Sequence, residues 1–155
     1  MSKILSILTH PNNKLRKKSI DVLPEKINSP EIRGFFQDLK LTMNKKDGVG
    51  LAAPQTGENI RVIIIKNEDK DKILINPVII KKSFVKLWGE EGCLSVPNTF
   101  GEVRRHKKIK CAFLNEKGKK ESIQAEKILA RIIQHEIDHL DGILFIDTAK
   151  NIKKL

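Results

Sequence analysis

One segment of the 155-residue sequence restricts the possible folds more than any other. The stretch EKILARIIQHEIDHLDG has the spacing of a helix over 126–140, and Gly142 follows it as a natural C-terminal stop. Its apolar residues cover more of the helix than one stripe; they are Ile128, Leu129, Ile132, Ile133 and Leu140. A helix with so wide an apolar surface must be covered on several sides, so we expect it at the centre of the fold.

The same helix carries chemically useful side chains within QHEIDH. At about 100° per residue, His135 and His139 lie about 40° apart around the helix, and Glu136 lies about 100° from His135. Both imidazoles can therefore point at one metal ion while the carboxylate reaches a water beside it. The HExxH pattern also arises by chance, but unpaired imidazoles on so apolar a helix would be costly to bury. We therefore favour a metal site, with Ile128 and Ile132 as its apolar floor.

Two histidines leave a metal ion short of ligands, and the sequence offers few candidates for the third. Downstream of the motif only Asp141 and Asp147 remain. Upstream, Cys93 lies in EEGCLSVP, which we expect to be an irregular loop because of its glycine and proline. A thiolate with two imidazoles makes three ligands and leaves one position open, as in catalytic metal sites. The other cysteine, Cys111 in KIKCAFL, is more typical of a small core residue in a strand.

The rest of the sequence indicates one further helix and several strands. Ser29 is a good N-cap for a helix that begins at Pro30 and ends before the glycines of KKDGVG. The expected strands are 61–66, 72–82 with an interruption at Asn76–Pro77, 83–88 running into the glycine-bearing loop, and a hairpin of 107–114 and 119–125. Two helices and several strands without regular βαβ alternation indicate an α+β fold in a single domain.

The balance of charges and the cysteine content limit the possible partners and location. With 30 Lys+Arg against 19 Asp+Glu, the net charge of +11 favours polyanions such as RNA, although most of the lysines are scattered over the sequence. Two cysteines do not make a disulfide framework. No apolar run has the length of a membrane span or a signal peptide, so we expect no membrane partner. The expected location is the cytoplasm, or an organelle if a transit peptide has been removed.

Three short motifs bear a specific resemblance to a known family. GVGLAAPQ (48–55), EGCLS (91–95) and QHEIDH (134–139) resemble the three motifs of the peptide deformylases, in the same order and at similar intervals. The resemblance covers nearly the whole chain and includes LINP (74–77) and LDGILF (140–145). It implies one catalytic domain over residues 1–155. The implied fold is α+β, with small antiparallel or mixed sheets that enclose the central HExxH helix, plus one N-terminal helix.

The resemblance also implies a role for individual residues. One divalent metal ion, typically Fe²⁺ and replaceable by Zn²⁺, Ni²⁺ or Co²⁺, would be bound by Cys93, His135 and His139. Glu136 would be the general acid and base for a metal-bound water that attacks the formyl carbon. Gln55 and the backbone amide of Leu94 would stabilise the oxyanion.

The implied substrate is the N-formylmethionyl end of a newly made protein, which is cleaved to formate and a free amine. The substrate-binding residues would be Val49, Gly50, Gly92, Ile128 and Ile132, with the isoleucines and the valine around the methionine side chain. For Val49 and Gly50 a plain tight turn before the next strand remains an alternative.

One arginine at a family position could orient the loop that carries the cysteine. Arg105 would pair with Glu91 or with Asp138, and an unpaired surface arginine is the alternative.

The partners are less well defined by the sequence. We expect a monomer that could contact ribosomal RNA transiently through its basic surface. The segment 98–108 departs from commoner family patterns, and the sequence ends soon after Gly142, without the long C-terminal helix that docks many bacterial relatives on the ribosome. Two rival functions remain open at this point. One is an HExxH peptidase that cuts internal peptide bonds, and the other is a basic RNA- or ribosome-binding protein with a structural metal.

Overall fold

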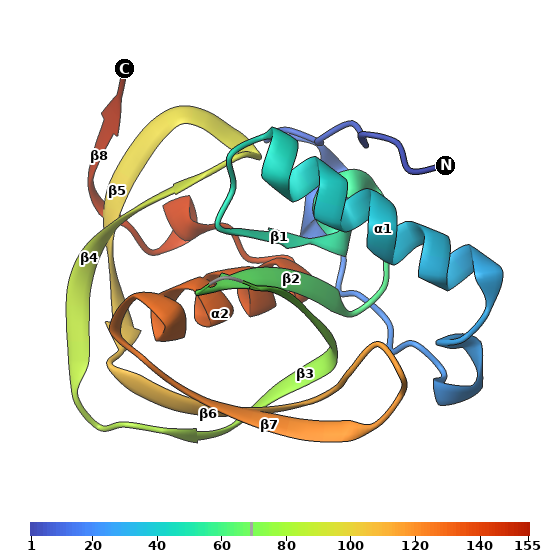
Figure 1. Ribbon diagram of the computed structural model, residues 1–155. Helices are drawn as coiled ribbons and strands as arrows, with labels where there is room; N and C mark the ends of the chain where they lie inside the picture. Colours follow the sequence, from blue (N-terminus) through green and yellow to red (C-terminus); the bar gives the residue numbers. More distant parts are fainter. Residues whose placement is uncertain (69) are drawn as a thin grey trace.

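The computed structural model describes residues 1–68 and 70–155, which form two antiparallel sheets around a central helix (Figure 1). The helices are α1 (Pro30–Lys45) and α2 (Lys127–Leu140). The five-stranded sheet has the order β1 (Gly50–Ala52), β2 (Val62–Asn67), β3 (Lys70–Lys82), β6 (Lys108–Leu114) and β7 (Lys120–Glu126). The three-stranded sheet has the order β4 (Lys86–Cys93), β5 (Val96–His106) and β8 (Lys150–Lys154). Within the described ranges, neither helix is long and apolar enough to cross a membrane.

Helix α2 lies in the middle of the molecule, with β4 and β5 along one side and β1 and β2 along another (Figure 1). Its residues Ala130, Ile133 and Leu140 are fully buried in a core shared with β2, β3, β6 and β7. Gly142 has a φ of +74°, the left-handed conformation expected just past a helix end. The predicted α+β fold with a central HExxH-bearing helix is confirmed.

Strand β2 is apolar on both faces because both of its faces are covered. Ile63 and Ile65 belong to the core cluster that contains α2, whereas Val62 and Ile64 belong to the cluster that contains α1. All four side chains are fully buried. This arrangement explains why the run VIII does not alternate with polar residues, and it confirms the predicted strand within one residue.

Helix α1 begins as its sequence predicts. The Ser29 side chain accepts a hydrogen bond from the backbone N–H of Ile32 at 3.3 Å, and proline occupies the first helical position. Phe36, Leu39 and Met43 are buried against β1, β2 and β3. The predicted hairpin of β6 and β7 is also confirmed, with Leu114 paired to Lys120 on either side of the turn.

The prediction of an irregular loop around Cys93 is wrong. Residues 86–93 form β4, which pairs with β5 along its whole length, so Cys93 ends a strand. Both glycines of this segment lie within the ladder, whose register shifts between Gly92 and Cys93, and neighbouring side chains take the space beside them. Gly92 lies opposite Phe100, and a Cβ at Gly92 would meet the Phe100 ring at 2.8 Å. Glycine in a strand here marks a close approach of another group. Strand β5 and the short strands β1 and β8 were not predicted.

The interruption that the sequence predicts in strand 72–82 is a bulge within one continuous strand. Strand β3 runs through Asn76–Pro77, and its register against β6 shifts between Ile75 and Val78. Asn76 adopts a φ of +51°, and its side-chain amide bonds both backbone polar groups of Val22. The proline therefore lies where the ladder is already offset and its missing N–H donor costs no sheet hydrogen bond.

Candidate metal centre

The side chains of Cys93, His135 and His139 meet at the centre of the molecule. One ligand atom from each lies within 4.8 Å of the others, and Sγ of Cys93 is 3.3 Å from Nε2 of His139. The two imidazole rings are 5.1 Å apart between centroids, at an interplanar angle of 74°. The thiol comes from the end of β4 and both imidazoles come from α2, one helical turn apart. The geometry therefore brings together the three residues that the sequence selected.

A carboxylate fixes the orientation of the first imidazole. Nδ1 of His135 lies 2.8 Å from Oε1 of Glu91, and because the Glu91 carboxylate can only accept, Nδ1 donates. In the neutral ring, Nε2 is then the atom left to bind a metal ion. Burial lowers the pKa of His135, but the negative charge of Glu136 and the bonds to Cys93 and Glu91 outweigh that effect and raise it. Burial, followed by the charge of His135, lowers the pKa of His139 well below its usual value, so His139 is neutral.

Glu91 is held by two arginines as well as by His135. Arg105 forms a two-pronged pair with it, Nε to Oε2 and Nη2 to Oε1, both at 2.9 Å, and Arg131 donates Nη1 to Oε2 at 2.8 Å. Arg105 also donates to Asp138 at 2.5 Å, so it contacts both acids that the sequence offered as alternatives. Burial alone would raise the pKa of Glu91, but Arg105 and then His135 lower it to about 2. Glu91 is therefore an anion at every physiological pH.

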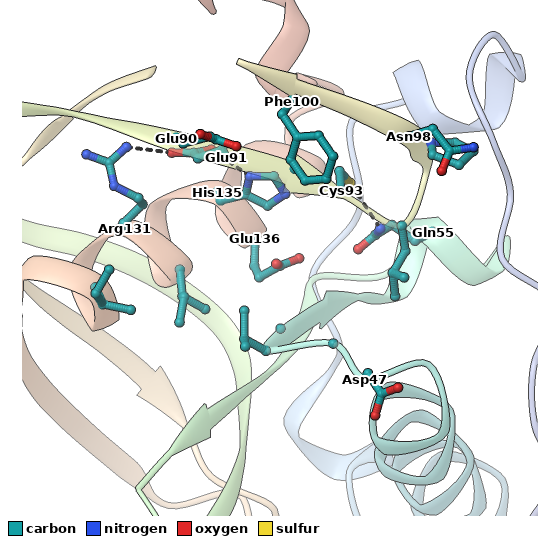
Figure 2. A pocket seen from close by; sticks show the side chains of 18 residues that line it. Asp47, Gln55, Glu90, Glu91, Cys93, Asn98, Phe100, Arg131, His135 and Glu136 are labelled. Carbon is teal, nitrogen blue, oxygen red and sulfur yellow. Dashed lines mark hydrogen bonds and ion pairs between the residues drawn. The ribbon is translucent and has the colours of Figure 1, made fainter. Parts of the chain in front are cut away.

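Glu136 points into the same space from the next position of α2 (Figure 2). Its side chain is buried, and its Oε1 atom has no hydrogen-bond partner among the described residues. Burial raises the pKa of Glu136 to about 7. A carboxyl group in this condition can take up and release a proton near neutral pH. The backbone of Gly50 passes so close that a Cβ there would lie 2.7 Å from Oε2 of Glu136.

Gln55 presents its amide N–H groups to the thiol. Its Oε1 accepts from the backbone N–H of Ala52 at 2.9 Å, and this contact fixes which end of the amide faces the site. Its Nε2 donates to Oγ of Ser95 at 3.1 Å and lies 3.5 Å from Sγ of Cys93. Gln55 is fully buried at the first 3₁₀ turn after β1. Leu94 directly follows Cys93, in the turn between β4 and β5.

A cleft of about 630 Å³ opens onto this centre (Figure 2). All five residues proposed for substrate binding line it, and they are Val49, Gly50, Gly92, Ile128 and Ile132. Ile132 is half-buried, but Ile128 is 69% exposed and lies at the rim, about two turns from His135, rather than on the expected floor. The sequence did not single out Phe100, Asn98 or Arg131 among the lining residues. Phe100 would have been found only from the register of β4 against β5.

The donor set suits a metal ion. A thiol and two imidazoles are ligands for Zn²⁺ and Fe²⁺, and within the described ranges they form a three-donor group with no fourth Cys, His, Asp or Glu. Nδ1 of His139 and Oε1 of Glu136 are both buried, and neither has a hydrogen-bond partner among the described residues. Such a concentration of unsatisfied polar atoms would be costly in a site built only for packing. The fold and the site together define a class, the α+β metallohydrolases with HExxH on a buried helix.

Comparison with known proteins identifies the family. Residues 4–155 match the model of the family described as polypeptide deformylase. The peptide deformylases of Symbiobacterium thermophilum and Desulfitobacterium hafniense are 47% and 44% identical, over 97% and 90% of this chain and 69% and 91% of their own lengths. A Met-Ala-Ser-bound class I type b peptide deformylase from Acinetobacter baumannii superposes with a TM-score of 0.92 at 34% identity, covering 95% of this chain and 99% of that one. The peptide deformylase of Synechococcus elongatus, solved with actinonin, has a TM-score of 0.90 at 36% identity, with coverages of 97% and 82%. The chain belongs to the peptide deformylase family and is an enzyme of that kind.

Proposed function

We propose that this enzyme removes the formyl group from the N-terminal formylmethionine of newly synthesised proteins and releases formate. The observation that carries the proposal is the meeting of Cys93, His135 and His139 beside Glu136, whose Oε1 has no hydrogen-bond partner among the described residues. The family membership supports the reaction class. We further propose that residues 1–155 make up a single catalytic domain.

We propose that one divalent metal ion is bound by Cys93, His135 and His139, with Fe²⁺ as the expected ion and Zn²⁺, Ni²⁺ or Co²⁺ as substitutes. When bound, the ion would supply Lewis acidity, which would lower the pKa of a water molecule toward about 7. Glu91 would orient the imidazole of His135, since it accepts a hydrogen bond from Nδ1 and keeps Nε2 directed at the metal site.

Glu136 is the proposed general acid and base. With its pKa raised to about 7, it can take a proton from the attacking water and pass it to the departing nitrogen. A bond forms between the water oxygen and the formyl carbon, and the bond from that carbon to nitrogen breaks. The products are formate and the free amine of methionine.

Gln55 and the backbone amide of Leu94 are the proposed donors to the oxyanion that develops on the formyl oxygen. The Gln55 amide is held by Ala52 and Ser95, so its N–H groups are aligned before the substrate arrives. A donor fixed in advance costs no reorganisation during the reaction. Its neutral charge also matters, because a carboxylate in its place would repel the developing negative charge.

The substrate would lie in the cleft with its methionine side chain against Ile128, Ile132 and Val49. Strand β1 is the edge of its sheet, and β2 pairs with only one of its sides. The backbone at Val49 and Gly50 can therefore bind an extended peptide as an added strand. A Met-Ala-Ser peptide is bound in the Acinetobacter structure, which supports a ligand of this kind here.

The decisive experiment compares formyl-Met-Ala-Ser with acetyl-Met-Ala-Ser on the metal-loaded enzyme, with formate or acetate release as the readout. We expect rapid cleavage of the formyl peptide alone, because in the proposed binding mode the acetyl methyl group would need more room than the hydrogen of the formyl group. Inertness toward both peptides would contradict the proposal. Cleavage of unformylated peptides at internal bonds would favour the peptidase alternative instead.

We also propose that the enzyme works as a cytoplasmic monomer that contacts ribosomal RNA transiently through its basic surface. The net charge of +11 supports this contact through counterion release. Affinity for ribosomes measured between 50 and about 200 mM salt should fall steeply. An affinity that does not change with salt would contradict the electrostatic contact.

A further inference from the structure

Arg131 connects the two elements that carry the candidate metal ligands. From α2 its guanidinium reaches across to β4 and β5. Nη1 donates to Val103 O at 2.8 Å and to Oε2 of Glu91 at 2.8 Å, and Nη2 donates to Leu87 O at 2.9 Å. Its side chain is only 13% exposed and forms part of the cleft wall. Figure 2 shows it directed at Glu91, on the far side of His135 from Cys93.

The place of the guanidinium depends on a glycine in the facing strand. A Cβ at Gly89 would lie 2.8 Å from both Cζ and Nη2 of Arg131, closer than side chains approach one another. Gly89 and Glu91 are two residues apart on β4 and therefore on the same face of the strand. The absent side chain at Gly89 thus leaves the space in which Arg131 reaches Glu91.

The position of β4 on α2 decides where the thiol meets the imidazoles. Cys93 follows Glu91 by two residues, and Glu91 itself accepts from Nδ1 of His135. Arg105 already binds Glu91 through two nitrogens, so Arg131 is a second cation on one carboxylate. Of the described residues of α2, however, Arg131 alone donates hydrogen bonds to backbone carbonyls of both β4 and β5. It therefore holds the strand that carries the thiol against the helix that carries the imidazoles.

We propose that Arg131, accommodated by Gly89, is a positioning residue that sets the geometry of the metal centre through Glu91. The inference rests on the proposed function of that centre. It predicts that the loss of the guanidinium contacts weakens metal binding and changes the ligand geometry, even though Arg131 is not itself a ligand.

The test measures Co²⁺ affinity and the Co²⁺ visible absorption spectrum of the full chain. Arg131→Met keeps the aliphatic stem and removes the three contacts. Arg61→Met is a matched control, because Arg61 also anchors α2, through Leu140 O, and has a similarly buried side chain at 15% exposed. We expect Arg131→Met to lose about 10- to 100-fold in Co²⁺ affinity with an altered spectrum. Arg61→Met should remain within about threefold of the unmodified enzyme even if both variants melt earlier.

Gly89→Ala gives a second, independent variant that keeps the guanidinium on the chain but displaces it. We expect Gly89→Ala to weaken Co²⁺ binding in the native background and to have no further effect when combined with Arg131→Met. This variant also provides the test if Arg131→Met does not fold. Full Co²⁺ affinity and an unchanged spectrum in Arg131→Met, or additive effects of the two changes, would overturn this inference alone. Failure of the unmodified enzyme to bind Co²⁺ would overturn the metal centre and this inference together.

Discussion

Sγ of Cys93 lies 3.3 Å from Nε2 of His139, although the two residues are 46 positions apart in the sequence. The contact joins the last residue of β4 to the last turn of α2. Ligands that are held in place by rigid elements give a metal site its precise geometry. Pairing of β4 with β5 and burial of α2 provide that rigidity.

The two cysteines should respond differently to alkylation. Cys111 is fully buried in β6, and burial raises its pKa to about 11, so its thiolate is scarce at pH 8. Cys93 lines the cleft. After chelation, we expect iodoacetamide to modify Cys93 alone, and added Zn²⁺ to prevent that modification. Mass spectrometry of the native and denatured protein checks this prediction, and a Cys93 reaction rate that saturating Zn²⁺ does not change would contradict it.

Substitution of Glu136 should separate proton transfer from metal binding. Glu136→Gln keeps the size of the side chain but removes its capacity to accept a proton. Loss of a general acid and base typically slows turnover by about 10²- to 10⁴-fold. We expect kcat to fall within that range while the metal content of the purified protein stays the same. Retention of more than about a tenth of the native kcat would exclude Glu136 from the proton transfer.

Gln55→Glu should remove the proposed oxyanion donor with little change in shape. Glutamate retains the oxygen that accepts from Ala52 N–H and replaces the N–H donors with a negative charge. Loss of one oxyanion donor typically costs about 10²- to 10³-fold in kcat. Ser95→Ala is the control, because it removes the other hydrogen-bond partner of the amide and leaves the donor in place. Steady-state kinetics on both variants test the difference, and equal losses would argue against a direct role for Gln55.

Gly48 and Gly50 provide a paired test of how closely the backbone must approach the carboxylate of Glu136, the proposed general acid and base. A Cβ at Gly50 would lie 2.7 Å from Oε2 of Glu136, whereas at Gly48 the nearest atoms are at 3.4 Å or beyond. Gly50→Ala should therefore displace the carboxylate and lower kcat by at least about tenfold. Gly48→Ala should retain most of the activity. The prediction fails if the two alanine variants have the same kcat.

Much of the fold and the site could be predicted because the signals were local. Ser29 and Pro30 marked the start of α1 through cap chemistry, and the helical spacing of His135 and His139 placed both on one face. The lack of a suitable ligand downstream of the HExxH motif then pointed to Cys93 as the third donor, which the structure places beside the imidazoles.

The features that escaped prediction depend on contacts between distant segments. Gly89 and Gly92 looked like loop residues, because the side chains that fill the space beside them come from α2 and β5. Arg131 looked like an ordinary charged position on a helix until its three acceptors were seen to lie on β4 and β5. No local pattern records such long-range complementarity.

Above all, we propose that a thiol from β4 and two imidazoles from α2 hold one metal ion on which turnover depends. Metal analysis and formyl-Met-Ala-Ser turnover of Cys93→Ala, beside the native enzyme, measure this most directly. The native enzyme should contain one metal ion per chain and release formate. Cys93→Ala should lose both the ion and the activity while remaining folded. A Cys93→Ala protein that keeps a full complement of metal and native turnover would contradict the account.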